Sequence, residues 1–172
     1  MEVFRLINNI TFGGNPLTLV GNEIKVGAVA PNFTALKTDL SPFSLEELKG
    51  KVVIISVVPS VDTPVCELQT IRFNTEAYEH GDINVITISA DLPFALGKFC
   101  ANKGIDTAIT LSDHKGLDFG MKYGFILDEL RLLSRGIIVI GKDGIVKYVE
   151  YVQEVTNHPD YDKAMDIAKE LV

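Results

Sequence analysis

The sequence has few of the residues that cross-link a small protein or bind metals. Its 172 residues include two cysteines, Cys66 and Cys100, and three histidines. Two cysteines are too few for a disulfide-scaffolded secreted domain, and these two do not form a C-x-x-C pair. The histidines are widely spaced and form neither H-E-x-x-H nor a Cys/His cluster, so we interpret them as surface residues and expect no metal site. The two cysteines therefore need another explanation.

Long apolar runs and basic clusters are also missing. No segment approaches the roughly 18 consecutive apolar residues of a membrane span, and the N-terminus lacks the pattern of a secretion signal. Sixteen basic residues against 23 acidic ones give a net charge of −7, without a basic cluster that could neutralise phosphates. There is likewise no G-x-G-x-x-G pattern and no phosphate-binding loop. We expect a cytoplasmic protein with neither membrane nor nucleic-acid partners.

The chain does contain enough apolar residues for a core. An apolar fraction of 47% and the absence of any linker or repeat favour a single domain over residues 1–172. From residue 51 onward, strand patterns alternate with helix patterns, which is typical of α/β proteins with parallel strand pairs. We expect strands over 31–36, 52–58, 84–90, 108–111, 136–140 and 145–151, a short helical segment over 44–50, and helices over 64–79, 91–103, 114–123 and 161–171.

An apolar patch over residues 1–10 has no clear assignment. After it, Thr11-Phe12 and residues 17–20 flank the turn sequence Gly-Gly-Asn-Pro and predict an N-terminal β-hairpin. Together with the later elements, this order predicts a thioredoxin-like fold with an added N-terminal hairpin.

The stretch Pro-Ser-Val-Asp-Thr-Pro-Val-Cys at 59–66 connects a buried strand to a helix. Pro59 ends the strand, and Thr63 followed by Pro64 is typical of an N-cap and a first helical residue. Cys66 then lies in the first helical turn, where unpaired N–H groups and the helix dipole favour a thiolate. Glu67 acts against a thiolate, so a nearby cation is needed. From these residues alone, Cys66 is either a small buried apolar residue or a reactive thiol, and the Thr63 hydroxyl is either a helix cap or a catalytic donor.

The motif P-x-x-x-T-x-x-C over 59–66 resembles the active-site motif of peroxiredoxins. The longer match over 59–66, together with Ile-Ser-Ala-Asp-Leu-Pro-Phe-Ala at 88–95 and Glu-Leu-Arg-Leu-Leu-Ser-Arg at 129–135, resembles the bacterial thiol peroxidase branch, an atypical 2-Cys group. The similarity extends from about Thr11 to Val172.

The resemblance implies a role for each matching residue. Cys66 would be the peroxidatic cysteine, whose thiolate attacks a hydroperoxide and becomes a sulfenic acid. Thr63 would hydrogen-bond the peroxide, and Pro59 would shield the pocket from water. Arg135 matches the family's active-site arginine, and its fixed donors would stabilise the thiolate and the developing oxyanion. Arg131, nearby in the sequence, would then be a surface charge.

The resemblance also implies that Cys100 is the resolving cysteine, which forms an intramolecular disulfide with Cys66 that thioredoxin reduces. A disulfide needs Cα atoms within about 7 Å, and the cysteines lie on different predicted helices, so we expect local unwinding in each turnover. Helical spacing also allows Cys100 to be buried beside Phe99 and Leu96 when reduced. The family further implies hydrogen peroxide and alkyl or lipid hydroperoxides as substrates, no metal, haem or flavin, and a homodimer.

Two other functions are compatible with parts of this pattern. A non-enzymatic redox sensor or binding module would keep the fold and the disulfide but would not consume peroxide. A thiol–disulfide isomerase would need the C-x-x-C pair that this chain lacks.

Overall fold

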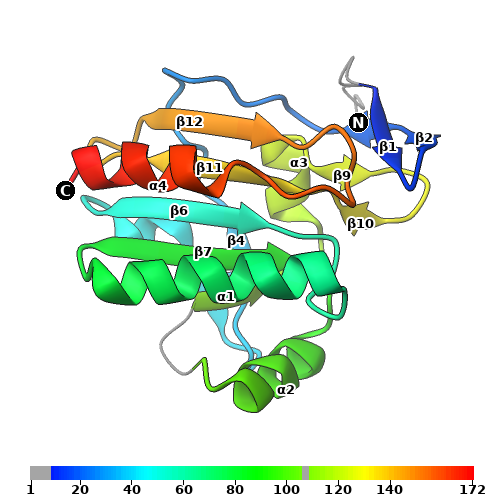
Figure 1. Cartoon of the computed structure of the whole chain (residues 1–172), viewed down its shortest axis with the longest axis horizontal. Coiled ribbons are helices and arrows are strands. Elements are labelled where there is room, and N and C mark those ends of the chain that lie inside the picture. The colour runs from blue at the N-terminus through cyan, green and yellow to red at the C-terminus, as the bar shows by residue number, and fades with distance from the viewer. Residues whose placement is uncertain (1–8, 106–108) are drawn as a thin grey trace.

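The computed structural model describes residues 9–105 and 109–172 and is organised around a seven-stranded sheet in the order β12-β11-β6-β7-β8-β4-β5 (Figure 1). Its strands are β4 (Thr34–Leu36), β5 (Pro42–Ser44), β6 (Val52–Val57), β7 (Ile83–Ser89), β8 (Ile109–Ser112), β11 (Gly136–Ile140) and β12 (Val146–Tyr151). Shorter strands are β1 (Ile10–Phe12), β2 (Asn15–Leu17), β3 (Leu19–Val20), β9 (Ile126–Leu127) and β10 (Leu132–Leu133). The helices are the 3-10 turn η1 (Leu45–Leu48), α1 (Pro64–Glu79), α2 (Pro93–Lys103), α3 (Asp118–Tyr123) and α4 (Tyr161–Glu170). Most of the apolar patch at 1–10, and the first residue of the strand expected at 108–111, lie outside the described residues.

The central strands β6, β7 and β8 are parallel, and α1 and α2 form the crossovers between them. All residues of β6 are buried, because the sheet is covered on both faces. Strand β11 pairs antiparallel with β6 and with β12, so the sheet is mixed. The alternation of strands and helices predicted from residue 51 is confirmed, and both crossover helices end where the sequence predicts.

Successive residues of β6 point into two different apolar cores. Val52 packs with Phe73 of α1 and Met165 of α4, whereas Val53 packs with Phe119 of α3. Figure 1 shows α1 and α4 on one face of the sheet. Among the described residues, no helix is both long and apolar enough to cross a membrane.

The N-terminal hairpin is shorter than predicted. Strand β1 pairs with β2, so Asn15 and Pro16 belong to a strand and Gly13-Gly14 alone form the turn. Both glycines have positive φ, at 58° and 81°, which a two-residue hairpin turn requires. Residues 19–20 leave the hairpin and pair with β9 instead.

The helix predicted over 114–123 begins later, at Asp118. Leu117 has a left-handed φ of 51°, which prevents the helix from extending back through it. The buried Asp113 carboxylate accepts the N–H groups of Phe119 and Gly120, at 3.0 and 2.8 Å, and so satisfies the free donors of the first turn.

Candidate active site

Residues 59–66 leave the carboxyl end of β6 and lead into α1. Pro59 is buried, Thr63 occupies the N-cap position with extended backbone angles, and Pro64 is the first helical residue. Cys66 therefore lies in the first turn of α1, and it is 0% exposed. The predicted helix start is confirmed, and it places the sulfur near the unpaired N–H groups of that turn.

The hydroxyl of Thr63 has a different partner from the one expected of a helix cap. It makes no side-chain capping bond and donates instead to the carbonyl oxygen of Ser60 at 3.3 Å. Thr63 is thus an N-cap by position, while its hydroxyl closes the loop that precedes the helix. Of the two uses that the sequence left open for this hydroxyl, helix cap or catalytic donor, the structure shows no capping bond.

Arg135 reaches Cys66 from the neighbouring strand pair, because it directly precedes β11, which lies beside β6. It is 2% exposed, and its Nη2 lies 2.9 Å from the sulfur of Cys66. Its Nη1 donates to Oε1 of Gln69 at 2.8 Å and its Nε donates to the carbonyl oxygen of Val155 at 2.6 Å. A buried, hydrogen-bonded cation beside a sulfur stabilises negative charge on that sulfur. Arg131, from the same stretch of sequence, is exposed.

Gln69 completes this network, although the sequence does not single it out. Its side chain is 0% exposed, and its Nε2 donates to the hydroxyl of Ser56 at 2.8 Å. Residues three apart share a helix face, so Gln69 and Cys66 point the same way from α1. Two features of the sequence could have indicated this network. Gln69 is a polar residue on the same helix face as Cys66, and Ser56 is a polar residue within an otherwise apolar strand.

A second cation neutralises Glu67. Nζ of Lys103 lies 2.6 Å from Oε1 of Glu67, and each side chain is about one-third exposed, at 37% and 36%. Lys103 is in the last turn of α2, whereas Glu67 follows Cys66 in the first turn of α1. The ion pair therefore offsets the charge that would oppose a thiolate, and it links the two helices that carry the cysteines.

Asp91 holds the loop that precedes Cys66. Its carboxylate accepts the hydroxyl of Ser60 at 2.7 Å, the N–H of Val61 at 2.9 Å and the hydroxyl of Ser89 at 2.8 Å. Asp91 follows β7, and the carboxyl ends of neighbouring parallel strands lie at the same edge of a sheet. The parallel pairing of β6 and β7 thus brings together two motifs that lie about thirty residues apart in the chain.

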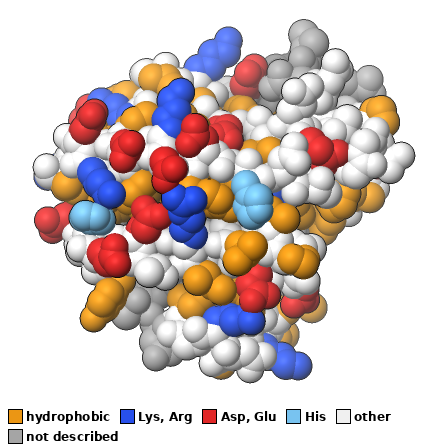
Figure 2. Space-filling model, viewed as in Figure 1, with side chains coloured by type: hydrophobic (Ala, Val, Ile, Leu, Met, Phe, Trp, Pro, Cys, Tyr) orange, Lys and Arg blue, Asp and Glu red, His pale blue; other side chains and the backbone are white. Residues whose placement is uncertain are grey.

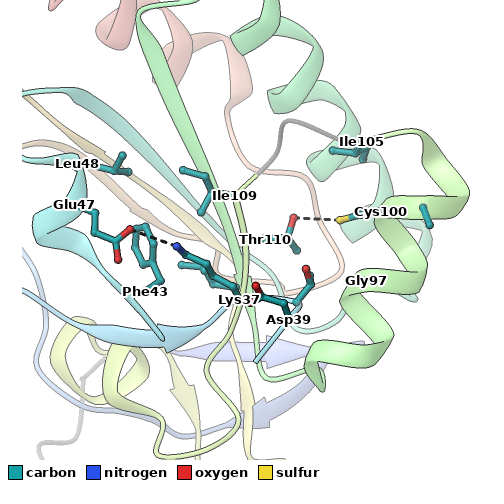
Figure 3. A pocket seen from close by; sticks show the side chains of 13 residues that line it. Lys37, Asp39, Phe43, Glu47, Leu48, Gly97, Cys100, Ile105, Ile109 and Thr110 are labelled. Atoms are coloured by element: carbon teal, nitrogen blue, oxygen red, sulfur yellow. Dashed lines mark hydrogen bonds and ion pairs between the residues drawn. The ribbon is translucent and has the colours of Figure 1, made fainter. Parts of the chain in front are cut away.

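Cys100 occupies a more open position in the last turn of α2. It is half-buried, and its sulfur lies 3.3 Å from the hydroxyl of Thr110 on β8. Gly104, with a φ of 65°, ends the helix and donates its N–H to the carbonyl oxygen of Cys100. Cys100 also lines a pocket of about 550 Å³, where Figure 3 shows the ion pair of Lys37 and Glu47 away from the cysteine.

The two cysteines are free thiols and belong to the same apolar neighbourhood. Cys66 is part of a buried cluster with Leu96 and Phe99, and Cys100 packs against that cluster from its edge. Cys100 packs beside these two residues as expected, but it is half-buried where burial was expected. The structure brings Arg135 to Cys66, whereas Cys100 has a separate hydrogen-bond partner.

The chemistry that this arrangement allows is that of a thiol nucleophile. Cys66 is buried beside a cation, in surroundings where electrostatic stabilisation is stronger than in water. Within residues 9–105 and 109–172, no three His, Cys, Asp or Glu side chains are grouped as metal ligands.

Comparison with known proteins shows the family to which the chain belongs. Residues 25–165 match the Redoxin family. A solved structure described as a peroxiredoxin-like protein from Aquifex aeolicus superposes with a TM-score of 0.89 at 37% identity, covering 100% of both chains. A thiol peroxidase from Chromobacterium violaceum has the same fold, with a TM-score of 0.86 at 22% identity over 96% of this chain and 97% of that one. The predicted thioredoxin-like α/β fold is confirmed.

Relatives with similar sequences identify a narrower group than the family and fold do. The chain is 57% identical over 161 residues to the thiol peroxidase of Halalkalibacterium halodurans, covering 94% of this chain and 97% of the relative. It is 56% identical over 163 residues to the thiol peroxidase of Bacillus subtilis, covering 95% and 98%. The chain therefore belongs to the bacterial thiol peroxidases within the Redoxin family, and it is a peroxiredoxin-type enzyme.

Proposed function

We propose that Cys66 is the peroxidatic nucleophile and that Arg135 activates it. The observation that carries this proposal is the 2.9 Å contact between the buried guanidinium and the sulfur. The thiolate of Cys66 attacks the terminal oxygen of a hydroperoxide, the O–O bond breaks, and the sulfur keeps that oxygen as a sulfenic acid. The departing oxygen takes a proton and leaves as water or an alcohol. The guanidinium stabilises negative charge on the sulfur before the attack and on the departing oxygen during it.

Thr63 and Pro59 shape the space in which this attack occurs. We assign to the Thr63 hydroxyl the hydrogen bond to the bound peroxide, which requires it to leave or share the carbonyl oxygen of Ser60. The buried Pro59 excludes bulk water at the end of β6. Because Cys66 is 0% exposed, a small opening of the loop precedes each attack. Hydrogen peroxide and small alkyl or lipid hydroperoxides are the proposed substrates.

Cys100 completes the cycle in this proposal. Its sulfur attacks the sulfenic acid sulfur of Cys66, water leaves, and an intramolecular disulfide forms. To do so it must leave the hydroxyl of Thr110, and the last turn of α2 must unwind. Thioredoxin then reduces the disulfide by thiol–disulfide exchange and is itself oxidised. This reductant belongs to a reducing compartment, so we place the reaction in the cytoplasm.

A homodimer completes the proposed assembly. Three large apolar side chains near the cysteine-bearing helices are more than half exposed: Leu68 at 56%, Leu92 at 54% and Phe94 at 69%. Figure 2 shows hydrophobic side chains among charged ones on the face of the molecule that carries α1. Contiguous exposed apolar surface marks protein–protein interaction sites, and we assign these three side chains to the surface that a second copy covers.

A peroxide-consumption assay with thioredoxin and its reductase tests the function. Wild-type protein is expected to consume hydroperoxide, Cys66→Ser to be inactive, and Cys100→Ser to form the sulfenic acid without closing a disulfide, as seen by intact-protein mass spectrometry. If the disulfide forms but no more than one equivalent of peroxide per protein is consumed, with no turnover in the presence of thioredoxin, a redox sensor is the better description. Unchanged consumption by Cys66→Ser would remove that residue from the chemistry.

A further inference from the structure

Val155 connects the active site to the N-terminal hairpin. Its carbonyl oxygen accepts the Nε hydrogen bond of Arg135 at 2.6 Å, and its N–H donates to the carbonyl oxygen of Thr11 in β1 at 2.8 Å. Its side chain is 1% exposed and lies in an apolar cluster with Ile10 and Leu19. Val155, which lies outside the regular strands, is thus hydrogen-bonded to the hairpin through its N–H and to the guanidinium of Arg135 through its carbonyl oxygen.

The hairpin is fastened to this segment by several further contacts. The N–H of Thr11 donates to the carbonyl oxygen of Gln153 at 2.8 Å. The Glu154 carboxylate accepts the N–H groups of Gly13 at 3.2 Å and Gly14 at 2.7 Å and the hydroxyl of Thr11 at 3.0 Å. Residues 153–155 therefore take their position from the hairpin.

Because of the geometry of arginine, the position of the Val155 carbonyl group affects the contact between Arg135 and the Cys66 sulfur. The guanidinium is planar and its donors are fixed relative to one another, so the bond from Nε sets the direction in which Nη2 points. Arg135 is 2% exposed, and water cannot readily replace a lost acceptor there. A shift of the Val155 carbonyl group would therefore turn the donor that lies 2.9 Å from Cys66.

We propose that the N-terminal hairpin is a positioning element for the active-site arginine, acting through the peptide of Val155. This inference rests on the proposed role of Arg135 and assigns a function to the hairpin, which contacts neither cysteine through any described hydrogen bond. Loosening the hairpin weakens the contact by which the guanidinium stabilises negative charge on the Cys66 sulfur, and so slows the attack on peroxide, without changing any residue that touches the sulfur.

The test compares two buried isoleucines in the full-length protein. Ile10 is 1% exposed within the hairpin cluster, whereas Ile83 is 4% exposed at the start of β7, the end of the strand that is remote from Cys66. Ile10→Ala is expected to slow sulfenic acid formation about tenfold, the effect of misplacing one hydrogen bond to a charged group, and to lower the thiolate absorbance. Ile83→Ala is expected to leave both unchanged at a comparable loss of stability.

A double variant separates positioning from general destabilisation. In an Arg135→Ala background, Ile10→Ala should produce no further slowing, because the group that it positions is absent. Persistence of the full Ile10→Ala effect there, or equal slowing by Ile83→Ala, would overturn the proposal. If Arg135→Ala alone leaves the attack unchanged, it is the proposed role of the arginine that fails.

Glu154→Gln provides a milder version of the same test should Ile10→Ala fail to fold. Hydrogen bonds, first from the Thr156 hydroxyl and then from backbone N–H groups that include Gly14, lower the pKa of Glu154 to about 2. Its carboxylate is therefore charged at neutral pH and holds the hairpin turn. Glu154→Gln should slow the attack by a smaller factor than Ile10→Ala, and an unchanged rate would contradict the proposal.

Discussion

The two cysteines belong to one apolar neighbourhood but have opposite surroundings. Cys66 is 0% exposed, and its sulfur is bound by a buried cation that makes two further hydrogen bonds. Cys100 is half-buried, its partner is the neutral hydroxyl of Thr110, and it lines an open pocket. The first site is fixed by interactions from several strands, and the second depends on the last turn of one helix.

This difference fits two kinds of task. A nucleophile that must be charged benefits from donors held in one geometry before the reaction begins. A thiol that must travel to another sulfur benefits from a helix end that opens at small cost. The glycine that ends α2 and the weak neutral hydrogen bond give Cys100 that freedom.

The largest expected effect comes from removing Arg135, the hydrogen-bond partner of the Cys66 sulfur, and is compared with removing the hydroxyl of Thr110. In a Cys100→Ser background, Arg135→Ala should slow sulfenic acid formation by about 10² to 10³, as expected for removal of a preorganised charged donor. In the same background, Thr110→Val, which removes the hydroxyl that the Cys100 sulfur contacts in the wild type, should leave that rate unchanged. Rapid-quench mass spectrometry measures both rates. Similar slowing by the two substitutions would mean that the two surroundings do not differ in function.

The second effect concerns the strand that supports Cys100. Asp113 follows β8 and is 2% exposed, and burial raises its pKa to about 6. Because this exceeds the value of about 3.9 in an unfolded chain, the folded state binds more protons between pH 4 and 6, and stability falls as pH rises through that window. Protonated Asp113 thus contributes about 3 kcal/mol to the free energy of unfolding, fully present below about pH 4 and lost as the pH rises through about 6.

Asp113→Asn tests this pH dependence. Denaturant unfolding at a series of pH values should show a decline for the wild type between about pH 4 and 6 that is steeper than in the variant. Glu154 titrates in a lower range, because its pKa is lowered to about 2. Parallel curves for the two proteins would show that Asp113 does not titrate in the predicted window.

The smallest expected effect concerns the ion pair between the cysteine-bearing helices. Lys103→Gln removes the contact with Glu67, which holds the end of α2 that must unwind. Partly exposed ion pairs contribute roughly 0.2 to 1 kcal/mol, so disulfide closure should become about 1.4- to fivefold faster. Lys98→Gln, on the exposed face of the same helix, is the control. Closure can be followed by quenched-flow mass spectrometry after one equivalent of peroxide, and slower closure would show that the pair aligns the helices instead of restraining them.

Local sequence predicted much of the fold and the position of Cys66. Proline, threonine and an apolar strand determine where β6 ends and α1 begins, because capping and strand burial act over a few neighbouring residues. The N-terminal hairpin was less predictable. Whether residues 19–20 pair with Thr11-Phe12, as predicted, or with β9, as found, depends on a strand more than a hundred residues away.

The roles of Gln69, Asp91 and Val155 were not predictable from local patterns. A buried glutamine, an aspartate after a strand and a valine in a loop have many uses in proteins, and the partners of these three lie on other strands. Arg135 was found through a motif that matched a family, since an isolated arginine is usually a surface charge.

By itself, the sequence determined the thiol at a helix start, the order of strands and helices, and the resemblance that named Arg135. These depend on residue type and on interactions between near neighbours. Only the tertiary structure decided that a cation lies 2.9 Å from Cys66, that Lys103 neutralises Glu67, and that the N-terminal hairpin holds the carbonyl group that orients the arginine. Charge and hydrogen-bond geometry act through space, and strand pairing determines which distant residues come within their range.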